Sequence, residues 1–166
     1  MKVINEAYDT MPMKYLGTVI SVDDVNASRK FCEDIFGLEL YQDYGRCIGF
    51  TCGLSLMQEF GRPAGVPEEK VLKRSDNIEL YFEEEHFDAF LKRLEDYPGI
   101  QYLHSAKEQP WGQRAIRFYD PNGHMIEVGE DMRAVIDRFL SSGMTKEETA
   151  KRIGTSLEDM EKLLND

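Results

Sequence analysis

The chain has 166 residues, 42% hydrophobic and 31% charged, which fits a globular protein of one domain with or without a short appendage. Its formal net charge of −11 argues against binding to duplex nucleic acid, because the longest basic cluster, at residues 70–74, is too short to offset the repulsion of phosphates. There is no apolar run of the roughly 18 residues that a membrane span needs, no apolar signal-peptide core in the first ten residues, and no CxxC pair among the three cysteines, so we expect a reduced, cytoplasmic protein.

The first half of the chain predicts a β-α-β-β-β order. Residues 1–13 show no clear period and are expected to form an arm or edge segment, whereas residues 15–22 are rich in β-branched and apolar side chains and predict a strand. Asp23 and Asp24 offer an N-cap for an amphipathic helix over 25–36, which Gly37 ends. Three short strands are predicted over 38–44, 46–51 and 54–60, with Gly45 and Gly53 at the turns between them.

The second half repeats this order after a Pro- and Gly-containing connector at 61–69. A strand is predicted over 77–83, a helix over 87–96, and further strands over 100–105, 114–119 and 125–128. The run Asp120-Pro121-Asn122-Gly123 predicts a tight turn between the last two strands, because proline presets one dihedral angle and Asn-Gly tolerates positive φ.

The two halves superpose in pattern with an offset of about 60 residues, although few letters match. We therefore expect an α+β fold of two tandem β-α-β-β-β units that form a curved eight-stranded sheet with a concave cavity. A generic α+β sheet of unrelated strands is the alternative.

The pattern changes after Gly129, so residues 1–130 are expected to form the sheet domain and residues 131–166 a helical C-terminal extension. An apolar stripe predicts one helix that Gly143 ends, Thr145 and Glu148 resemble a capping box, and Ser156 is expected to cap a third helix. The spacing of Ala150, Gly154 and Met160 is that of a helix-turn-helix motif, but the would-be recognition helix is too acidic for DNA. A helical hairpin that packs on the sheet or contacts a partner is favoured instead.

The run Pro110-Trp111-Gly112-Gln113-Arg114, followed by Arg117-Phe118-Tyr119-Asp120-Pro121-Asn122-Gly123-His124-Met125-Ile126-Glu127-Val128, resembles the last hairpin of a vicinal-oxygen-chelate domain, the fold of glyoxalase, bleomycin-resistance and dioxygenase proteins. Val22 and Asp24 resemble the family's first strand-helix junction, and Gly53-Leu54-Ser55-Leu56 resembles its fourth strand. The resemblance covers roughly residues 14–130.

In metal-dependent members of that family, four positions usually carry His, Glu or Gln, His and Glu. The corresponding positions here are Gly17, then Met57 or Gln58, then Asn77 and Glu127. Of the two candidates for the second position, Met57 and Gln58, the glutamine is the chemically plausible ligand. Because glycine has no side chain and asparagine is a weaker ligand than histidine, the resemblance implies that the full metal site is absent; the cofactor stays unknown, and a divalent metal is not favoured.

Several residues are candidates for lining the cavity without a metal. Glu127 is expected to face the concave side, because Ile126 and Val128 would pack under the helices, and there it would act as a general base or bind a ligand cation. Pairing of Glu127 with Arg114 or another basic group is the alternative. Trp111, the only tryptophan, would stack on a flat ligand or pack at a seam of the protein.

Further candidates come from the strands of the second half. Arg114 and Arg117 must lie on opposite faces of their strand, and Arg114 is favoured for the cavity because it shares the parity of Ile116 and Phe118. His104 is the histidine expected to point inward, whereas His86 and His124 are expected at the surface. Hydroxyls of Tyr81 and Tyr102 are further candidates, with core packing as their alternative.

These observations leave three hypotheses for function. The first is a metal-independent protein that binds a small organic ligand; the second is a metal-dependent lyase, isomerase or dioxygenase of the same superfamily; the third is an interaction or regulatory module acting through the helical tail. The resemblance also implies a homodimer.

Overall fold

A computed structural model describes residues 14–165, and it confirms an α+β architecture with eight strands. The strands are β1 (Thr18–Val22), β2 (Leu40–Asp43), β3 (Cys47–Phe50), β4 (Leu54–Gln58), β5 (Glu79–Glu84), β6 (Gln101–Glu108), β7 (Arg114–Tyr119) and β8 (Met125–Glu130). The helices are α1 (Val25–Phe36), α2 (Gly61–Ala64), the 3₁₀ turn η1 (Glu68–Lys70), α3 (Phe87–Asp96), α4 (Met132–Ser141), α5 (Lys146–Ile153) and α6 (Leu157–Asn165). The arm expected at residues 1–13 lies outside the described residues.

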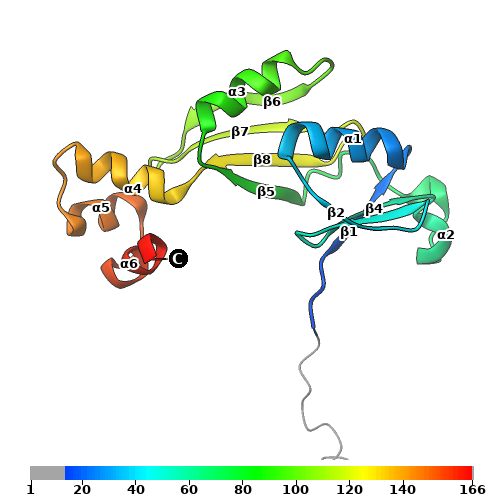
Figure 1. Ribbon diagram of the computed structural model, residues 1–166, viewed down its shortest axis with the longest axis horizontal. Coiled ribbons are helices and arrows are strands. Elements are labelled where there is room, and N and C mark those ends of the chain that lie inside the picture. Colours follow the sequence, from blue (N-terminus) through cyan, green and yellow to red (C-terminus); the bar gives the residue numbers. More distant parts are fainter. Residues whose placement is uncertain (1–13, 166) are drawn as a thin grey trace, which may run out of the picture.

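The strands form two four-stranded sheets with the same connectivity, β1-β4-β3-β2 and β5-β8-β7-β6. β1 pairs with β4, and β5 with β8, in parallel; the other neighbouring strands are antiparallel. This common order confirms the internal repeat of the β-α-β-β-β pattern. Figure 1 shows the first sheet at one end of the molecule, the second in the middle, and the C-terminal helices at the far end.

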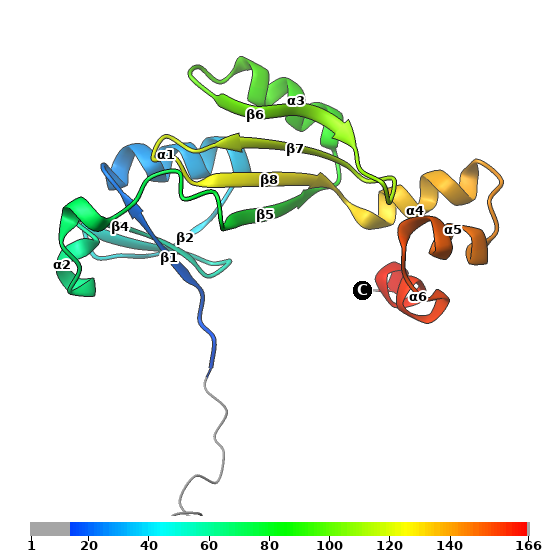
Figure 2. The same ribbon diagram turned by 180° about the vertical axis from the view of Figure 1, so that it is seen from behind.

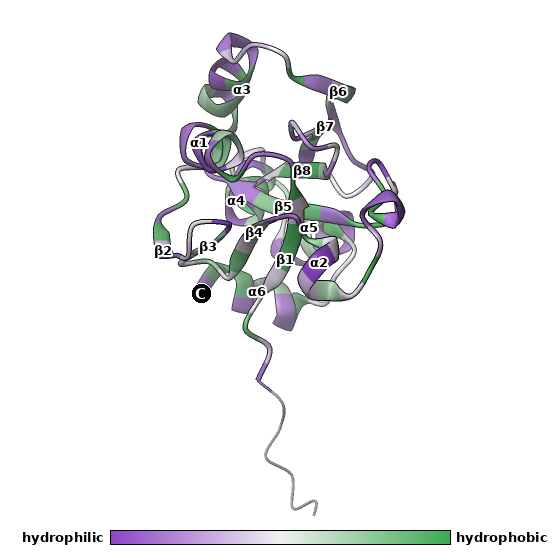
Figure 3. Cartoon of the chain, turned by 90° about the vertical axis from the view of Figure 1, so that its right-hand side faces the viewer, coloured by the Kyte–Doolittle hydropathy of each residue, from purple (hydrophilic) through white to green (hydrophobic). Residues whose placement is uncertain are grey.

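Helices α1 and α3 lie on the same side of the second sheet, as both Figure 1 and Figure 2 show. Their apolar stripes fill the core between helices and strands, and Phe31, Phe90 and Phe118 are all almost fully buried there. The Phe36 ring of α1 stacks on Phe82 of β5 with 4.4 Å between centroids, so α1 belongs to the core of both halves. Figure 3 accordingly shows helices of mixed hydropathy beside the largely hydrophobic strands β1 and β4.

The Asp-Pro-Asn-Gly turn between β7 and β8 also joins the two halves. Asn122 is buried, accepts a hydrogen bond from the backbone N–H of Asp23 (2.8 Å), and donates one to the Ser28 hydroxyl on α1 (2.9 Å). The asparagine of this turn therefore has a long-range role besides its local one.

The C-terminal helices have an apolar cluster of their own, centred on Val135, Ile136 and Met160. The predicted capping box is confirmed, since Thr145 and Glu148 bond each other's backbone N–H, and Ser156 accepts from Asp159 N at 3.1 Å. None of the helices between residues 14 and 165 has the length and apolar character that a membrane span requires.

The observed limits of most elements are close to those expected. The helices 25–36 and 87–96 and the strand 114–119 are confirmed to the residue. The connector at 61–69 is more ordered than expected, because it contains α2 and the start of η1, and the last strand runs on to Glu130 because it pairs with β5 along its whole length.

Candidate functional site

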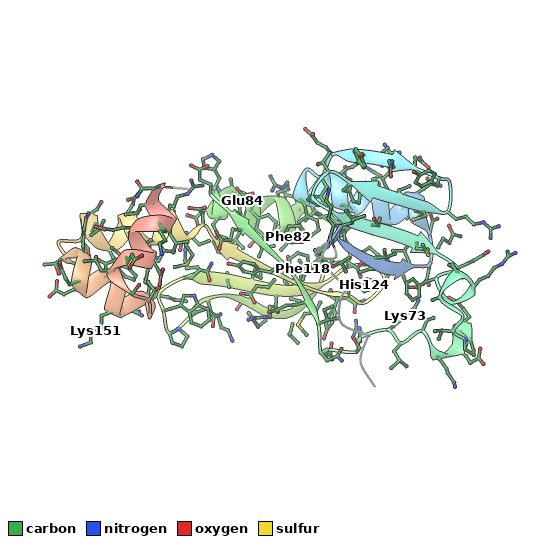
Figure 4. All side chains as sticks on the ribbon, turned by 90° about the horizontal axis from the view of Figure 1, so that it is seen from below. Lys73, Phe82, Glu84, Phe118, His124 and Lys151 are labelled. Carbon is green, nitrogen blue, oxygen red and sulfur yellow. The ribbon has the colours of Figure 1, made fainter. Side chains whose placement is uncertain are left out.

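The face of the second sheet that α1 and α3 do not cover, here called the open face, carries one polar residue from each strand in a single row. Register pairs Tyr81 of β5 with Glu127 of β8, Glu127 with Arg117 of β7, and Arg117 with His104 of β6. Paired residues of neighbouring strands project to the same face, so the four side chains are adjacent. Figure 4 views the molecule from below, the side opposite α1 and α3.

Glu127 is the buried carboxylate of this row. Only 4% of the residue is exposed, and Arg117 donates a hydrogen bond to it while also binding Glu79, with 2.8 Å from Nε of Arg117 to the Glu79 carboxylate. Burial raises the pKa of Glu127, and the charge of Arg117 offsets only part of that rise. In contrast, the hydrogen bond from Arg117 lowers the pKa of the more exposed Glu79.

Tyr81 extends the row toward β5 and the loop before β7. Its hydroxyl donates to the Glu83 carboxylate at 2.7 Å and accepts from the Gln113 amide at 2.9 Å. Burial and the hydrogen bond to Glu83 raise the pKa of Tyr81 above its usual range. Gln113 in turn accepts from the indole N–H of Trp111 at 2.9 Å, so the predicted residue Trp111 is connected to the open face through Gln113.

The expected orientation of Arg114 is wrong. Arg114 lies on the helix-covered face, where it donates to Asp88 of α3 (2.8 Å) and to Glu130 (3.0 Å) and sits over the Phe87 ring. The parity shared with Ile116 marks the core under α3, so Arg117 is the arginine of the open face. The alternative for Glu127, pairing with a basic group, is what the structure has, with Arg117 rather than Arg114 as the partner.

Two other predicted residues also point away from Glu127. The Tyr102 hydroxyl donates to the Leu94 carbonyl of α3 at 3.4 Å, which places it on the helix side of β6. The Gln58 side chain accepts from the backbone N–H of Val25 at the start of α1 (3.4 Å), so Gln58 shares the helix-facing side of β4 with the buried Leu54 and Leu56. The expectation that Gln58 faces the cavity is therefore wrong in orientation.

His104 lies in the row, as predicted, and its Nδ1 is 2.8 Å from the Ser105 carbonyl oxygen. Its Nε2 is buried with no hydrogen-bond partner among the described residues. Asn77 is exposed and precedes β5 by two positions. The other two histidines do not join the row: His86 precedes α3, and His124 contacts Asp120 at 2.9 Å beside the turn.

Gly17 lies where the two sheets approach each other. Together with Tyr15, Glu79 and Tyr81 it lines a cavity of about 360 Å³. Its φ is +149°, and a Cβ at this position would lie 1.7 Å from the carbonyl oxygen of Gly53. No side chain fits there unless β1 and β4 move apart.

Within residues 14–165, no group of three or more His, Cys, Asp or Glu side chains is placed to hold a metal ion. Of the four positions singled out by the resemblance, only Glu127 brings a charged donor to the open face, and Arg117 already binds it.

Sequence reasoning did not select three residues of the site: Arg117, Glu79 and Gln113. The sequence signal for Arg117 was its separation of three residues from Arg114, which puts the two arginines on opposite faces of β7. That separation does not tell which face α3 covers. Glu79 and Gln113 depend on register and on a loop contact, which no local pattern encodes.

Comparisons with known proteins agree with this architecture. Residues 15–133 match the family described as glyoxalase-like domain. A solved protein of unknown function from Agrobacterium tumefaciens str. C58 is 31% identical, with a TM-score of 0.63, over 74% of this chain and 97% of that chain. A lactoylglutathione lyase from Agrobacterium tumefaciens is 26% identical, with a TM-score of 0.52, over 73% of this chain and 96% of that chain.

A more distant structure shares the fold alone. A glyoxalase/bleomycin resistance protein/dioxygenase family enzyme from Burkholderia phytofirmans PsJN is 12% identical, with a TM-score of 0.63, over 71% of this chain and 98% of that chain. None of the curated proteins compared matches the chain. The family match ends at residue 133, just after α4 begins, so most of the C-terminal helices lie beyond it.

Proposed function

The chain belongs to the glyoxalase-like domain family, and from this premise we propose that it binds a small organic ligand on the open face without the metal that metal-dependent relatives use. The observation that carries the proposal is the buried Glu127, held by Arg117 in a row with Tyr81 and His104. Buried charged groups of this kind fix the orientation of a ligand in the pockets of many proteins.

The donor set supports the metal-free part of the proposal. A divalent cation at Glu127 would have to displace Arg117, and it would find no side chain at Gly17 and only a neutral amide at Asn77. Sites for transition metals need several nitrogen, oxygen or sulfur donors at bonding distance. The residues present therefore do not fit the family's metal.

The charge of the open face indicates the kind of ligand. Arg117 binds Glu79 and Glu127, and Glu83 accepts the hydrogen bond of the Tyr81 hydroxyl, so three carboxylates lie along β5 and β8. These groups are mainly hydrogen-bond acceptors. We therefore propose that the ligand carries a positively charged or hydrogen-bond-donating group, with an aromatic or apolar body that reaches Trp111.

Native mass spectrometry and metal analysis of protein purified without chelators test the proposal first. The expected result is an organic adduct or none, with no stoichiometric metal. Stoichiometric metal in the wild type that is lost in Glu127→Gln would contradict the proposal.

A matched pair of probes tests the ligand class. 2-Phenylethylammonium and 3-phenylpropionate have the same ring and similar length but opposite charge. We expect the amine to perturb the fluorescence of Trp111 saturably and the acid to have no effect, with binding of the amine weakened about tenfold in Glu127→Gln, as is typical when one charged hydrogen bond is lost. Binding of the acid in preference to the amine would reject the ligand class.

An enzyme of the same superfamily is the second candidate, and the raised pKa of Glu127 is the observation that favours it. A carboxylate whose pKa is raised is a stronger base than an ordinary glutamate and is suited to accept a proton from a substrate. Turnover that depends on Glu127, persists in the presence of a chelator and rises as Glu127 loses its proton would favour this candidate over a pure binding protein.

The resemblance also supports a homodimer, and the sheets have edge strands with which a second copy could pair: β1 and β2 in the first sheet, β5 and β6 in the second. Sedimentation equilibrium tests this part of the proposal: we expect the mass of two chains, whereas the mass of one chain across the micromolar range would exclude the dimer.

A further inference from the structure

Gln113 connects the loop before β7 to the open face, and every polar group of its side chain is used. It is 3% exposed; Oε1 accepts from the Trp111 indole (2.9 Å), and Nε2 donates to the Tyr81 hydroxyl oxygen (2.9 Å) and to the Glu130 carbonyl (2.8 Å). A buried amide with all its hydrogen bonds made is held in one orientation.

The direction of these hydrogen bonds is fixed by chemistry. A backbone carbonyl can only accept, so the amide nitrogen of Gln113 must face Glu130, and the Tyr81 oxygen must accept from the same nitrogen. The Tyr81 proton is then free to go to Glu83. A Cβ on Gly129 would lie 2.6 Å from Nε2 of Gln113, so the absence of a side chain there makes room for this arrangement.

The C-terminal helices pack against the same loop. A Cβ on Gly112 would lie 2.3 Å from the Phe139 ring of α4, so the backbone of Gly112 rests directly on that ring. The guanidinium groups of Arg138 and Arg152 lie over the Phe139 ring at 5.2 and 5.4 Å from its centroid.

Both arginines also bond the loop or its neighbours. Arg138 donates to the Gly112 carbonyl (2.8 Å) and to Glu130 (2.9 Å), and Arg152 donates to the Pro110 carbonyl and to Glu108 (3.0 Å). Arg138 and Arg152 thus hold the backbone on both sides of Trp111, at Pro110 and Gly112. Arg138 also binds Glu130, whose carbonyl orients Gln113.

We infer that Gln113 is a positioning residue of the ligand site, and that α4 and α5 hold it in place, so that the C-terminal extension sets the positions of Trp111 and Tyr81. The inference rests on the proposed function for its effect on ligand binding. The coupling between tail, Gln113 and Trp111 can be measured without any ligand.

The test uses the single indole N–H signal of the ¹⁵N-labelled full-length protein, because Trp111 is the only tryptophan. In Gln113→Leu we expect this signal to shift and its hydrogen exchange to accelerate at least about tenfold, because the buried partner is lost. In Gln113→Glu an acceptor remains for the indole, so its protection should persist, while the hydrogen bonds that Nε2 donates to Tyr81 and to the Glu130 carbonyl are lost. If the variants merely lost structure in general, the indole exchange of Gln113→Leu and of Gln113→Glu would be accelerated alike.

The tail is tested with a matched pair of double variants. Arg138→Ala/Arg152→Ala removes the arginine hydrogen bonds to the loop and should accelerate indole exchange at least about tenfold, whereas Arg133→Ala/Lys151→Ala removes two charges from the same helices and should leave it unchanged. Unchanged exchange in the first double variant, or equal acceleration in both, would overturn the inference.

Binding of 2-phenylethylammonium separates this inference from the proposed function. If the wild type binds the amine, Gln113→Leu, Gln113→Glu and the first double variant should each bind it at least about fivefold more weakly, an effect of the size usual for one misplaced hydrogen bond. Full affinity in all three would reject Gln113 as a positioning residue, whereas a wild type that binds neither probe would count against the proposed function and leave the exchange result standing.

Discussion

The close approach of Gly17 and Gly53 fixes what residue 17 can be. We expect Gly17→Ala to lower the free energy of unfolding by at least about 4 kcal/mol, or to prevent folding, because overlap with a backbone oxygen cannot be relieved by a side-chain rotation. Gly45→Ala is the matched control: Gly45 also has positive φ (+78°), but a Cβ added there would meet nothing within 4 Å, so only the cost of the left-handed conformation, about 1–2 kcal/mol, is expected. Equal urea-denaturation midpoints for the two variants would contradict this account.

Glu130 is a second residue whose environment makes a measurable prediction. Burial alone would raise the pKa of Glu130, but hydrogen bonds and the charges of Arg114 and Arg138 outweigh it and lower the pKa. The carboxylate therefore stabilises the folded chain above the ordinary glutamate pKa of about 4.3, and this stabilisation is lost as the pH falls through the lower pKa of the folded state.

Glu130→Gln should accordingly lower the free energy of unfolding by about 1–3 kcal/mol at pH 7 and by much less near pH 3, measured by urea denaturation. Glu158→Gln on α6 is the control, since the Glu158 side chain is 81% exposed beside Lys162 and its loss should cost at most a few tenths of a kcal/mol, as for other surface pairs. A loss for Glu130→Gln that is as large at pH 3 as at pH 7 would contradict the ion-pair explanation.

At the scale of elements, the turn between β7 and β8 holds α1. Asn122→Ala leaves the Ser28 hydroxyl and the Asp23 N–H without their partner, and we expect a loss of about 1–3 kcal/mol in stability. A double-mutant cycle with Ser28→Ala isolates the contact between turn and helix, with an expected coupling of about 1 kcal/mol. Strict additivity of the two single changes would show that the contact contributes nothing.

The elements also show how far sequence patterns reach. Helix 25–36 was predictable to the residue because its Asp24 cap, the Gly37 stop and the apolar stripe agree, and helix 87–96 because its apolar stripe ends just before a Pro-Gly break. The orientation of β7 was not, because both of its faces are buried: Ala115 and Tyr119 lie on the open face yet are 0% and 8% exposed, like Ile116 and Phe118 under α3. Alternation carries no information about direction in such a strand.

The same limit applies to the site. Glu127 was predictable because its neighbours Ile126 and Val128 clearly belong under the helices. Its partner Arg117 depends on which face α3 covers, and the contacts of Gln113 depend on loop and register. Interactions that join three elements are set by tertiary packing, which a periodicity argument does not contain.

At the scale of the whole molecule, the two apolar clusters predict unfolding in parts. Met160 is fully buried in the cluster of α4–α6, so Met160→Ala should cost about 2–5 kcal/mol, most of it in that cluster. Hydrogen exchange followed by mass spectrometry should show faster exchange in α4–α6 and in residues 110–113, with β7 and β8 keeping their protection. Leu163→Ala, on the exposed side of α6, is the control. Uniform loss of protection across both sheets would mean that the chain unfolds as one unit.

The contact between Gly17 and Gly53 limits how this chain could acquire a metal site. Any substitution that introduces a side-chain ligand at position 17 must force the strands β1 and β4 apart. Selection that proceeds by single substitutions, each of which must leave a folded protein, would therefore not yield a side-chain ligand at position 17. If this chain were selected for metal-dependent catalysis, we would expect new ligands to arise around His104 and Glu127 rather than at position 17.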